Sequence, residues 1–192
     1  ILKALKIIKK EAAESIAVGY LHSYVNPAHE LKTREILKQH RPDLDVSISS
    51  EVAPEIREYE RFSTTVCNAY VQPLMASYLG KIKAGLEGKD IKSPFLLITS
   101  GGGLTTLETA SKFPIRLVES GPAGGAILAS KVSSQIGSNA SLSFDMGGTT
   151  AKAALIEKGL PKIAPMMEVA RTNRFKKGSG LPVFVPVIDM IE

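Results

Sequence analysis

The sequence predicts an α/β layer fold, because helical stretches alternate along the chain with short apolar runs typical of strands. Three segments carry this prediction. Residues 16–21 form a continuous apolar run, as in a buried strand, and residues 63–86 place large apolar side chains every fourth position, as in a helix. Residues 141–144 alternate serine with leucine and phenylalanine, as in a strand with two unlike faces. The 192 residues, 44% of them hydrophobic, are enough to bury a core.

The first half of the chain begins with a helix predicted over residues 1–13, where lysines lie between leucines and isoleucines. Asn26 and Pro27 mark the start of a second helix, because asparagine caps free N–H groups and proline suits the first turn. We expect this helix to end near His40, shortly before a proline. A strand over residues 45–49 follows it.

The long helix over residues 63–86 contains Pro73, which should kink it or remove one hydrogen bond. After this helix the sequence predicts a strand over residues 95–99, a glycine-rich loop and a short helix. A second strand is predicted over residues 115–118, and a helix of small residues then runs to about Gly137.

The stretch over residues 141–158 is the most informative in the chain. A strand that ends at Asp145 is followed by Gly147, Gly148, two threonines and a second apolar run, so the sequence predicts strand, tight turn and strand. Glycine has no Cβ, so several backbone N–H groups of such a turn can converge on an anion. The spacing does not match a P-loop, and an ordinary Gly-Gly hairpin turn is the alternative.

The residues beside this turn suit a nucleotide phosphate. A carboxylate such as that of Asp145 can hold a hydrated Mg²⁺ or orient a water, and the hydroxyl of Thr149 or Thr150 can contact phosphate. Upstream, Pro122 suits the first turn of a helix whose small residues allow close packing. The order of strand, small-residue helix and D-x-G-G-T hairpin resembles the junction between the two lobes of the actin-like ATPase superfamily.

Longer strings along essentially the whole chain extend this resemblance. They are His22 to Glu30, Ser50 to Arg61, Ser63 to Pro73, Thr99 to Leu104, Glu119 to Pro122, Phe144 to Lys152, and Gly178 to Pro182. In their residues and in their order they resemble the hydantoinase A/5-oxoprolinase family. The resemblance implies an ATP-dependent enzyme that opens a cyclic amide, namely hydantoin, N-methylhydantoin or 5-oxoproline. The alternatives are a subunit of an ATP-dependent ketone carboxylase and a non-catalytic actin-like interaction module.

The resemblance also implies a site and its ligands. Asp145 would be catalytic and would bind Mg²⁺. The residues expected to bind ATP are Gly101, Gly102, Ser120, Gly121, Gly147, Gly148, Thr149, Thr150 and Lys152. The expected partners are a small-molecule cyclic amide substrate and a hydantoinase B-type subunit or domain.

The implied fold is that of actin-like ATPase lobes, which are ribonuclease H-like, and it is incomplete in this chain. Residues 1–137 would be the remainder of the first lobe, and residues 138–192 the opening hairpins of the second. The family's D-x-G-G-T-F-T-D phosphate hairpin does not occur in the sequence, so we expect an internal fragment of a longer protein. With one of two phosphate hairpins, the fragment alone should not hydrolyse ATP efficiently.

Composition and charge exclude several classes of protein. The formal net charge is +5, but six phenylalanines, five tyrosines and no tryptophan leave few aromatic side chains to interleave with the basic runs. Nucleic-acid binding is therefore not expected. No apolar stretch reaches the roughly 18 residues of a membrane helix, so no membrane partner is expected. Cys67 is the single cysteine, which rules out a disulfide framework and favours the cytoplasm.

Other polar residues leave more than one interpretation open. The loop over residues 99–103 follows a strand end and is either a ligand site or a plain glycine-rich loop. The polar line of Thr65, Asn68 and Gln72 on the long helix is either a structural network or a substrate-facing edge. A metal site at His22 and His29 is not favoured, because no further ligand set lies nearby in the sequence.

Two charged segments are also ambiguous. Glu51, Glu55 and Glu58 suit an exposed face, with substrate contact as the lesser interpretation. The basic stretch over residues 171–180 is either a solvated surface or a mobile loop that touches a partner or an acidic ligand.

Overall fold

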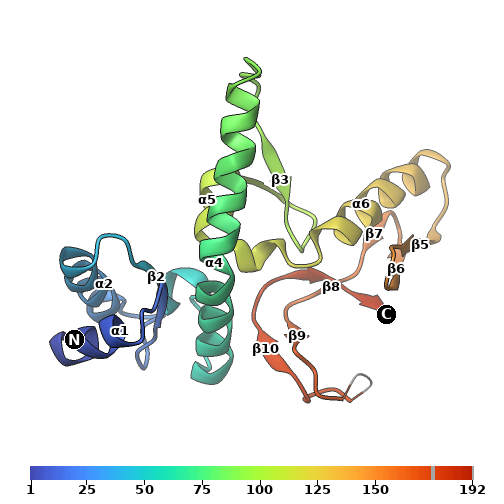
Figure 1. The fold of residues 1–192 in the computed structure, drawn as a ribbon. Helices are drawn as coiled ribbons and strands as arrows, with labels where there is room; N and C mark the ends of the chain where they lie inside the picture. Colours follow the sequence, from blue (N-terminus) through green and yellow to red (C-terminus); the bar gives the residue numbers. More distant parts are fainter. Residues whose placement is uncertain (174–175, 192) are drawn as a thin grey trace. The chain divides into compact units, whose positions relative to one another are not determined.

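The computed structural model describes residues 1–173 and 176–191 and has a mixed α/β fold (Figure 1). It divides into two compact units, each described by itself below. The first unit consists of Ile1–Ser93, Ser111–Ile115 and Glu168–Phe184. The second unit consists of Pro94–Ala110, Arg116–Met167 and Val185–Glu192.

The helices are α1 (Leu2–Lys10), α2 (Ala28–His40), α3 (Ser49–Val52), α4 (Glu58–Glu87), α5 (Leu107–Lys112), a 3₁₀ helix (Pro114–Leu117) and α6 (Ser120–Gln135). The strands are β1 (Ser15–Val18), β2 (Asp45–Ile48), β3 (Leu96–Ile98), β4 (Leu104–Thr106), β5 (Ala140–Met146), β6 (Ala151–Glu157), β7 (Leu160–Pro161), β8 (Ile163–Ala164), β9 (Met167–Val169), β10 (Leu181–Val183), β11 (Val187–Ile188) and β12 (Met190–Ile191).

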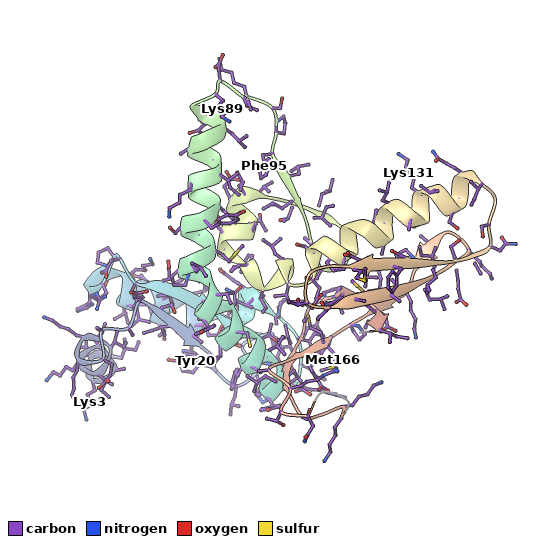
Figure 2. All side chains as sticks on the ribbon, turned by 45° about the vertical axis from the view of Figure 1, so that its right-hand side comes forward. Lys3, Tyr20, Lys89, Phe95, Lys131 and Met166 are labelled. Atoms are coloured by element: carbon purple, nitrogen blue, oxygen red, sulfur yellow. The ribbon has the colours of Figure 1, made fainter. Side chains whose placement is uncertain are left out.

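The first unit is built on a parallel pair of strands, β1 and β2, in register from Ser15 opposite Asp45 to Val18 opposite Ile48. Helices α2 and α4 pack against both strands. The apolar core contains Val18, Leu37 and Ile48, with side chains of α1 packed beside them. Lys3 projects outward from α1 (Figure 2), so the lysine face of this helix is solvated.

A buried polar network joins the strand ends of the first unit to its helices. The side chains of Glu30 and Arg61 are both 0% exposed. The Ser49 hydroxyl donates to Glu30 Oε1 at 2.6 Å and accepts from Arg61 Nε at 3.2 Å. The backbone N–H groups of Tyr20 and Ser50 donate to the two oxygens of Glu30 at 2.9 and 2.8 Å. Every oxygen of this carboxylate is therefore satisfied, as a buried charge requires.

The second unit is built on a hairpin of β5 and β6, in antiparallel register from Ala140 opposite Glu157 to Met146 opposite Ala151. β7 and β12 also pair with β6. Helix α6 packs against β5, β6 and β7 (Figure 1). The small core contains Ala123, Ala126, Ala154 and Ile188, so the small residues of α6 lie against the sheet, as their size suggests.

The predicted strand over residues 115–118 is wrong. Pro114–Leu117 form a 3₁₀ helix, because proline holds φ near −65° and so favours a helical turn. The N–H of Ile115 donates to Asn68 Oδ1 at 3.3 Å and not to a neighbouring strand. The long helix α4 runs through Pro73 from Glu58 to Glu87, so proline interrupts its hydrogen bonding without ending the helix.

Among the described residues, none of the helices is both long and apolar enough to cross a membrane. The predicted boundary between residues 137 and 138 concerns the lobes of a larger fold and stays a prediction.

Candidate functional site

The hairpin of β5 and β6 places the sequence-predicted phosphate turn at its tip. Asp145 lies directly opposite Lys152 across the two strands. The turn over residues 147–150 closes the hairpin, and the Gly147 N–H donates to the Thr150 carbonyl at 2.9 Å. Strand, tight turn and strand follow in the predicted order.

The turn offers several groups that no other part of the described chain engages. Within residues 1–173 and 176–191, the backbone N–H groups of Gly148, Thr149 and Thr150 make no hydrogen bond, and neither does the carboxylate of Asp145. A Cβ built on Gly148 would meet nothing within 4 Å. Free amides beside a free carboxylate suit a phosphate chain with its Mg²⁺, because Mg²⁺ at such sites is held by one or two carboxylates together with the phosphates and waters.

Lys152 is the charged group of the hairpin that does have a partner. Its Nζ pairs with a carboxylate oxygen of Glu119, which immediately precedes α6. The Lys152 side chain is 15% exposed. Glu119 itself adopts the left-handed conformation, with φ 67°, which is uncommon for a residue with a Cβ. The ion pair therefore links the β5–β6 hairpin to the residue that directly precedes α6.

Ser120 and Gly121 are the first two residues of α6. No side chain caps this helix start, and Pro122 has no N–H, so the first-turn N–H groups of Ser120 and Gly121 remain available. Such a helix start favours an anion. A role of Ser120 and Gly121 in ATP binding is compatible with this geometry and stays a prediction.

Gly101 and Gly102 lie in the loop between β3 and β4. A Cβ on Gly102, whose φ is +83°, would lie 2.7 Å from Ile127 Cδ1 of α6. A Cβ on Gly101 would lie 3.2 Å from the Pro186 carbonyl oxygen. Both glycines thus have a packing reason in this loop, and their contact with ATP stays a prediction.

All ten sequence-predicted site residues belong to the second unit. The ion pair of Lys152 with Glu119 brings the hairpin beside Ser120, and the contact of Gly102 with Ile127 brings the glycine loop against the same helix. Residues that are separated by up to 51 positions in the sequence, from Gly101 to Lys152, are in this way arranged around α6.

Sequence reasoning missed an apolar groove in this unit, of about 630 Å³. It runs between α6 and β5, with Leu128 and Val132 on the helix and Leu142 and Phe144 on the strand. Asp145 lies at one end of this lining. The signal was present in the sequence, because Leu142 and Phe144 define one face of β5, but their alternation does not tell which face is covered.

No group of three or more His, Cys, Asp or Glu side chains within the described residues is placed to hold a metal ion. His22 and His29 are exposed. A metal at Asp145 would therefore need oxygens from phosphate or water besides this one carboxylate.

The polar line on α4 belongs to the interior of the first unit. The Asn68 amide donates to Ser47 Oγ at 2.9 Å and to the Lys112 carbonyl at 3.1 Å. Ser47 donates to Gln72 Oε1 at 2.9 Å, and the Thr65 hydroxyl donates to the Arg61 carbonyl. Of the two interpretations, the structural network is the one observed.

The acidic residues after β2 are also engaged. Glu51 pairs with Arg34 at 2.8 Å and with Lys112 at 2.7 Å. Its partial burial raises its pKa, but the hydrogen bonds from both cations outweigh that effect and leave the pKa lowered. Glu58 accepts from the His22 backbone N–H and from Arg61. These contacts tie the turns of the first unit together.

The basic stretch over residues 171–180 is partly described. Glu168 Oε1 accepts from the Gly178 backbone N–H at 2.7 Å, and Glu168 also pairs with Arg171 at 3.2 Å. Arg174 lies outside the described residues. A partner or acidic ligand at this stretch stays a prediction.

The class of protein follows from the match of the chain to a known family. Residues 61–192 match the family described as Hydantoinase/oxoprolinase, and residues 1–41 match its N-terminal region. The chain belongs to the hydantoinase/oxoprolinase family.

Three relatives illustrate the family. An uncharacterized protein of Methanocaldococcus jannaschii is 43% identical, over 99% of this chain and 28% of its own length. The 5-oxoprolinase of Saccharomyces cerevisiae is 39% identical, over 76% of this chain and 11% of its own length. The caprolactamase subunit alpha of Pseudomonas jessenii is 31% identical, over 81% of this chain and 22% of its own length. The chain thus spans between about a tenth and three tenths of the length of these relatives.

Solved structures give the same assignment. The nucleotide-free structure of acetone carboxylase, an ATP-dependent enzyme, superposes with a TM-score of 0.80 at 26% identity, over 98% of this chain and 26% of that one. The ATP-dependent caprolactamase of Pseudomonas jessenii superposes with a TM-score of 0.75 at 25% identity, over 99% of this chain and 26% of that one.

Proposed function

We propose that this chain forms the phosphate-binding part of an ATP-dependent enzyme that opens a cyclic amide ring, with its elements arranged as in the lobes of an actin-like ATPase. The observation that carries the proposal is the carboxylate of Asp145, which has no partner within the described residues, beside the free backbone N–H groups of Gly148, Thr149 and Thr150. The turn over residues 147–150 receives the phosphates of ATP. Asp145 holds Mg²⁺ or positions water, and Lys152 adds positive charge at the edge of the site.

The chemistry requires activation of a poor electrophile, because an amide carbonyl resists attack by water. In the proposed reaction the amide oxygen takes the γ-phosphoryl group of ATP, and ADP leaves. Water then adds to the activated carbon, and the ring C–N bond breaks with proton transfer to nitrogen, which leaves an acyl phosphate. A second water hydrolyses this acyl phosphate to the carboxylate and inorganic phosphate. Bound Mg²⁺ supplies charge that stabilises the transferring phosphoryl group. The hairpin amides orient the phosphates and stabilise their developing charge.

Relatives support this substrate class. The names 5-oxoprolinase and caprolactamase each denote action on a cyclic amide, and the caprolactamase and acetone carboxylase structures are both described as ATP-dependent. The caprolactamase relative is an alpha subunit, which supports a partner subunit here too. We propose a hydantoinase B-type subunit or domain for that partner.

A second candidate function is a subunit of an ATP-dependent ketone carboxylase. The superposition on acetone carboxylase, with its TM-score of 0.80, favours it. The phosphate site would be unchanged, and a ketone enolate oxygen would replace the amide oxygen as the phosphoryl acceptor. A non-catalytic interaction module would follow if the full-length protein lacked the other phosphate hairpin.

The test is phosphate release by the complete protein with its partner. Hydantoin, N-methylhydantoin and 5-oxoproline are supplied in turn with ATP and Mg²⁺, and acetone or acetophenone is supplied with bicarbonate. We expect stimulation by a cyclic amide. Stimulation by a ketone alone would select the carboxylase function, and no stimulation with any acceptor would contradict both.

Asp145→Asn tests the site within this assay. The amide keeps the size of the side chain but removes its charge, so we expect turnover to fall at least about a hundredfold while the circular dichroism spectrum stays unchanged. Asp90→Asn is the matched control, because Asp90 is an exposed carboxylate whose ion pair with Lys92 is solvated. Full activity of Asp145→Asn would remove Asp145 from the mechanism.

A further inference from the structure

Within the described part of the chain, two carboxylates border Lys152, and the lysine pairs with one of them. Asp145 is its directly opposed neighbour across the hairpin, and residues at such positions have Cβ atoms about 5 Å apart. Nevertheless the ammonium of Lys152 pairs with Glu119, and within the described residues the Asp145 carboxylate has no hydrogen-bond or ion-pair partner. The choice of partner leaves one of the two carboxylates free.

Glu119 is held in a conformation that serves this choice. Its φ of 67° places it in the left-handed region, which disfavours a residue with a Cβ by about 1 kcal/mol or more. Its carbonyl accepts the first hydrogen bond of α6, from Ala123 at 3.1 Å. The helix thus fixes the backbone of Glu119, and the side chain extends from that fixed point to the hairpin.

We propose that Glu119 is a positioning residue that keeps Asp145 available for a divalent cation by engaging Lys152. This inference rests on the proposed function, in which Asp145 binds Mg²⁺. A partly buried ammonium is stabilised by a carboxylate, and among the residues that the structure describes Glu119 and Asp145 are the two carboxylates beside it. Without the charge of Glu119, Lys152 turns to Asp145 and competes with Mg²⁺ for its oxygens.

The competition predicts a specific signature. Glu119→Gln should raise the Mg²⁺ concentration needed for half-maximal ATP binding on the order of tenfold, because the cation must now displace an ion pair. At saturating Mg²⁺ the cation has displaced the lysine, so turnover should stay within about threefold of the wild-type value. A residue with a purely structural role would lower turnover at all Mg²⁺ concentrations.

The experiment measures ATP binding to the complete protein by isothermal titration calorimetry at a series of Mg²⁺ concentrations. Turnover is measured at the same concentrations. Glu119→Asp retains the charge and should restore the wild-type midpoint to within about threefold. Glu119→Gln in a Lys152→Gln background should produce no further shift, because the competing ammonium is gone. Glu157→Gln is the matched control, since Glu157 is an exposed carboxylate on the same strand as Lys152.

Each outcome decides a separate point. An unshifted midpoint in Glu119→Gln, with a shifted one in Asp145→Asn, overturns the role of Glu119 and leaves the proposed function intact. An equal shift with and without Lys152 also overturns it, because Glu119 would then act by another route. Wild-type ATP binding that does not depend on Mg²⁺ overturns the proposed metal role of Asp145 and this inference with it. If Glu119→Gln does not fold, Glu119→Asn takes its place, because asparagine also lacks the charge and tolerates the left-handed conformation; an unshifted midpoint in Glu119→Asn overturns the role of Glu119.

Discussion

Glu30 shows how a single charged residue can be retained in the interior of the first unit. Burial raises the pKa of its carboxyl group, but hydrogen bonds from the Ser49 hydroxyl and from the backbone N–H groups of Ser50 and Tyr20 stabilise the ionised form more strongly. The net effect is a lowered pKa. Arg61 completes the network through Ser49 and packs its guanidinium 5.4 Å from the Tyr24 ring centre and 5.1 Å from that of Phe62.

The lowered pKa of Glu30 makes stability depend on pH. Since the folded state binds this proton more weakly than the unfolded state, the stabilisation is complete above the unfolded pKa, near 4.5. It is lost as the pH falls from there through the folded pKa. Glu30→Gln should lower the free energy of unfolding by about 2 to 3 kcal/mol at pH 7 and flatten its fall between pH 5 and more acidic values. Urea unfolding at a series of pH values measures both.

Glu35→Gln on the same helix is the matched control, because Glu35 is half exposed and pairs with Lys32 at the surface. Its change in unfolding free energy should stay below about 0.5 kcal/mol. Equal losses in the two variants would mean that burial of Glu30 does not determine its contribution.

Sequence reasoning predicted the β5–β6 hairpin and its glycine turn but not the network around Glu30. Asp145 and the glycines after it are adjacent in the sequence, so a local pattern reveals them. The hydrogen-bond partners of Glu30 lie 10 to 20 positions away in the sequence. A local sequence pattern cannot predict partners at that separation. The same reason explains Glu119, whose partner Lys152 lies 33 positions further along.

Among the elements, the helices and the long hairpin were predicted well because their signals are periodic and local. Helix α2 ends at His40, as predicted, and begins at Ala28, directly after the proline that was expected in its first turn. The strands β7 to β12 were not predicted, since each has only two or three residues, too few for a period to emerge. Residues 115–118 were mistaken for a strand because an apolar run alone does not distinguish a strand from a helical turn.

The contact of the glycine loop with α6 can be tested at Gly102. Alanine there would combine the positive φ with a Cβ 2.7 Å from Ile127, so we expect Gly102→Ala to lower the free energy of unfolding by about 1 to 2 kcal/mol. Gly125→Ala within α6 is the matched control. Its Cβ meets nothing within 4 Å, and alanine favours a helix, so it should stabilise by up to about 1 kcal/mol. Thermal unfolding measures the change in stability of each variant. A change of the same sign in both variants would contradict the packing role of Gly102.

For the molecule as a whole, the family resemblance predicted more than the residue patterns did. The match to Hydantoinase/oxoprolinase over residues 61–192 confirms the family, and the mixed α/β fold is observed. The actin-like arrangement of lobes stays part of the proposed function.

The 192 residues alone should release phosphate from ATP no faster than buffer does. A phosphoryl group must be held from both sides for efficient transfer, and the sequence contains only one of the two hairpins that the proposed function assigns to phosphate binding. The measurement is phosphate release against ATP concentration at saturating Mg²⁺. A saturable rate that Asp145→Asn abolishes would show that one hairpin suffices.

Strand β5 has a practical consequence for anyone who handles this chain. In the described sheet β5 lies at one end of the strand order, next to β6 alone, and Leu142, Phe144 and Met146 along it are largely exposed. An edge strand with unpaired backbone groups and exposed apolar side chains tends to pair with strands of other molecules. Concentrated solutions of this polypeptide should therefore self-associate through β5.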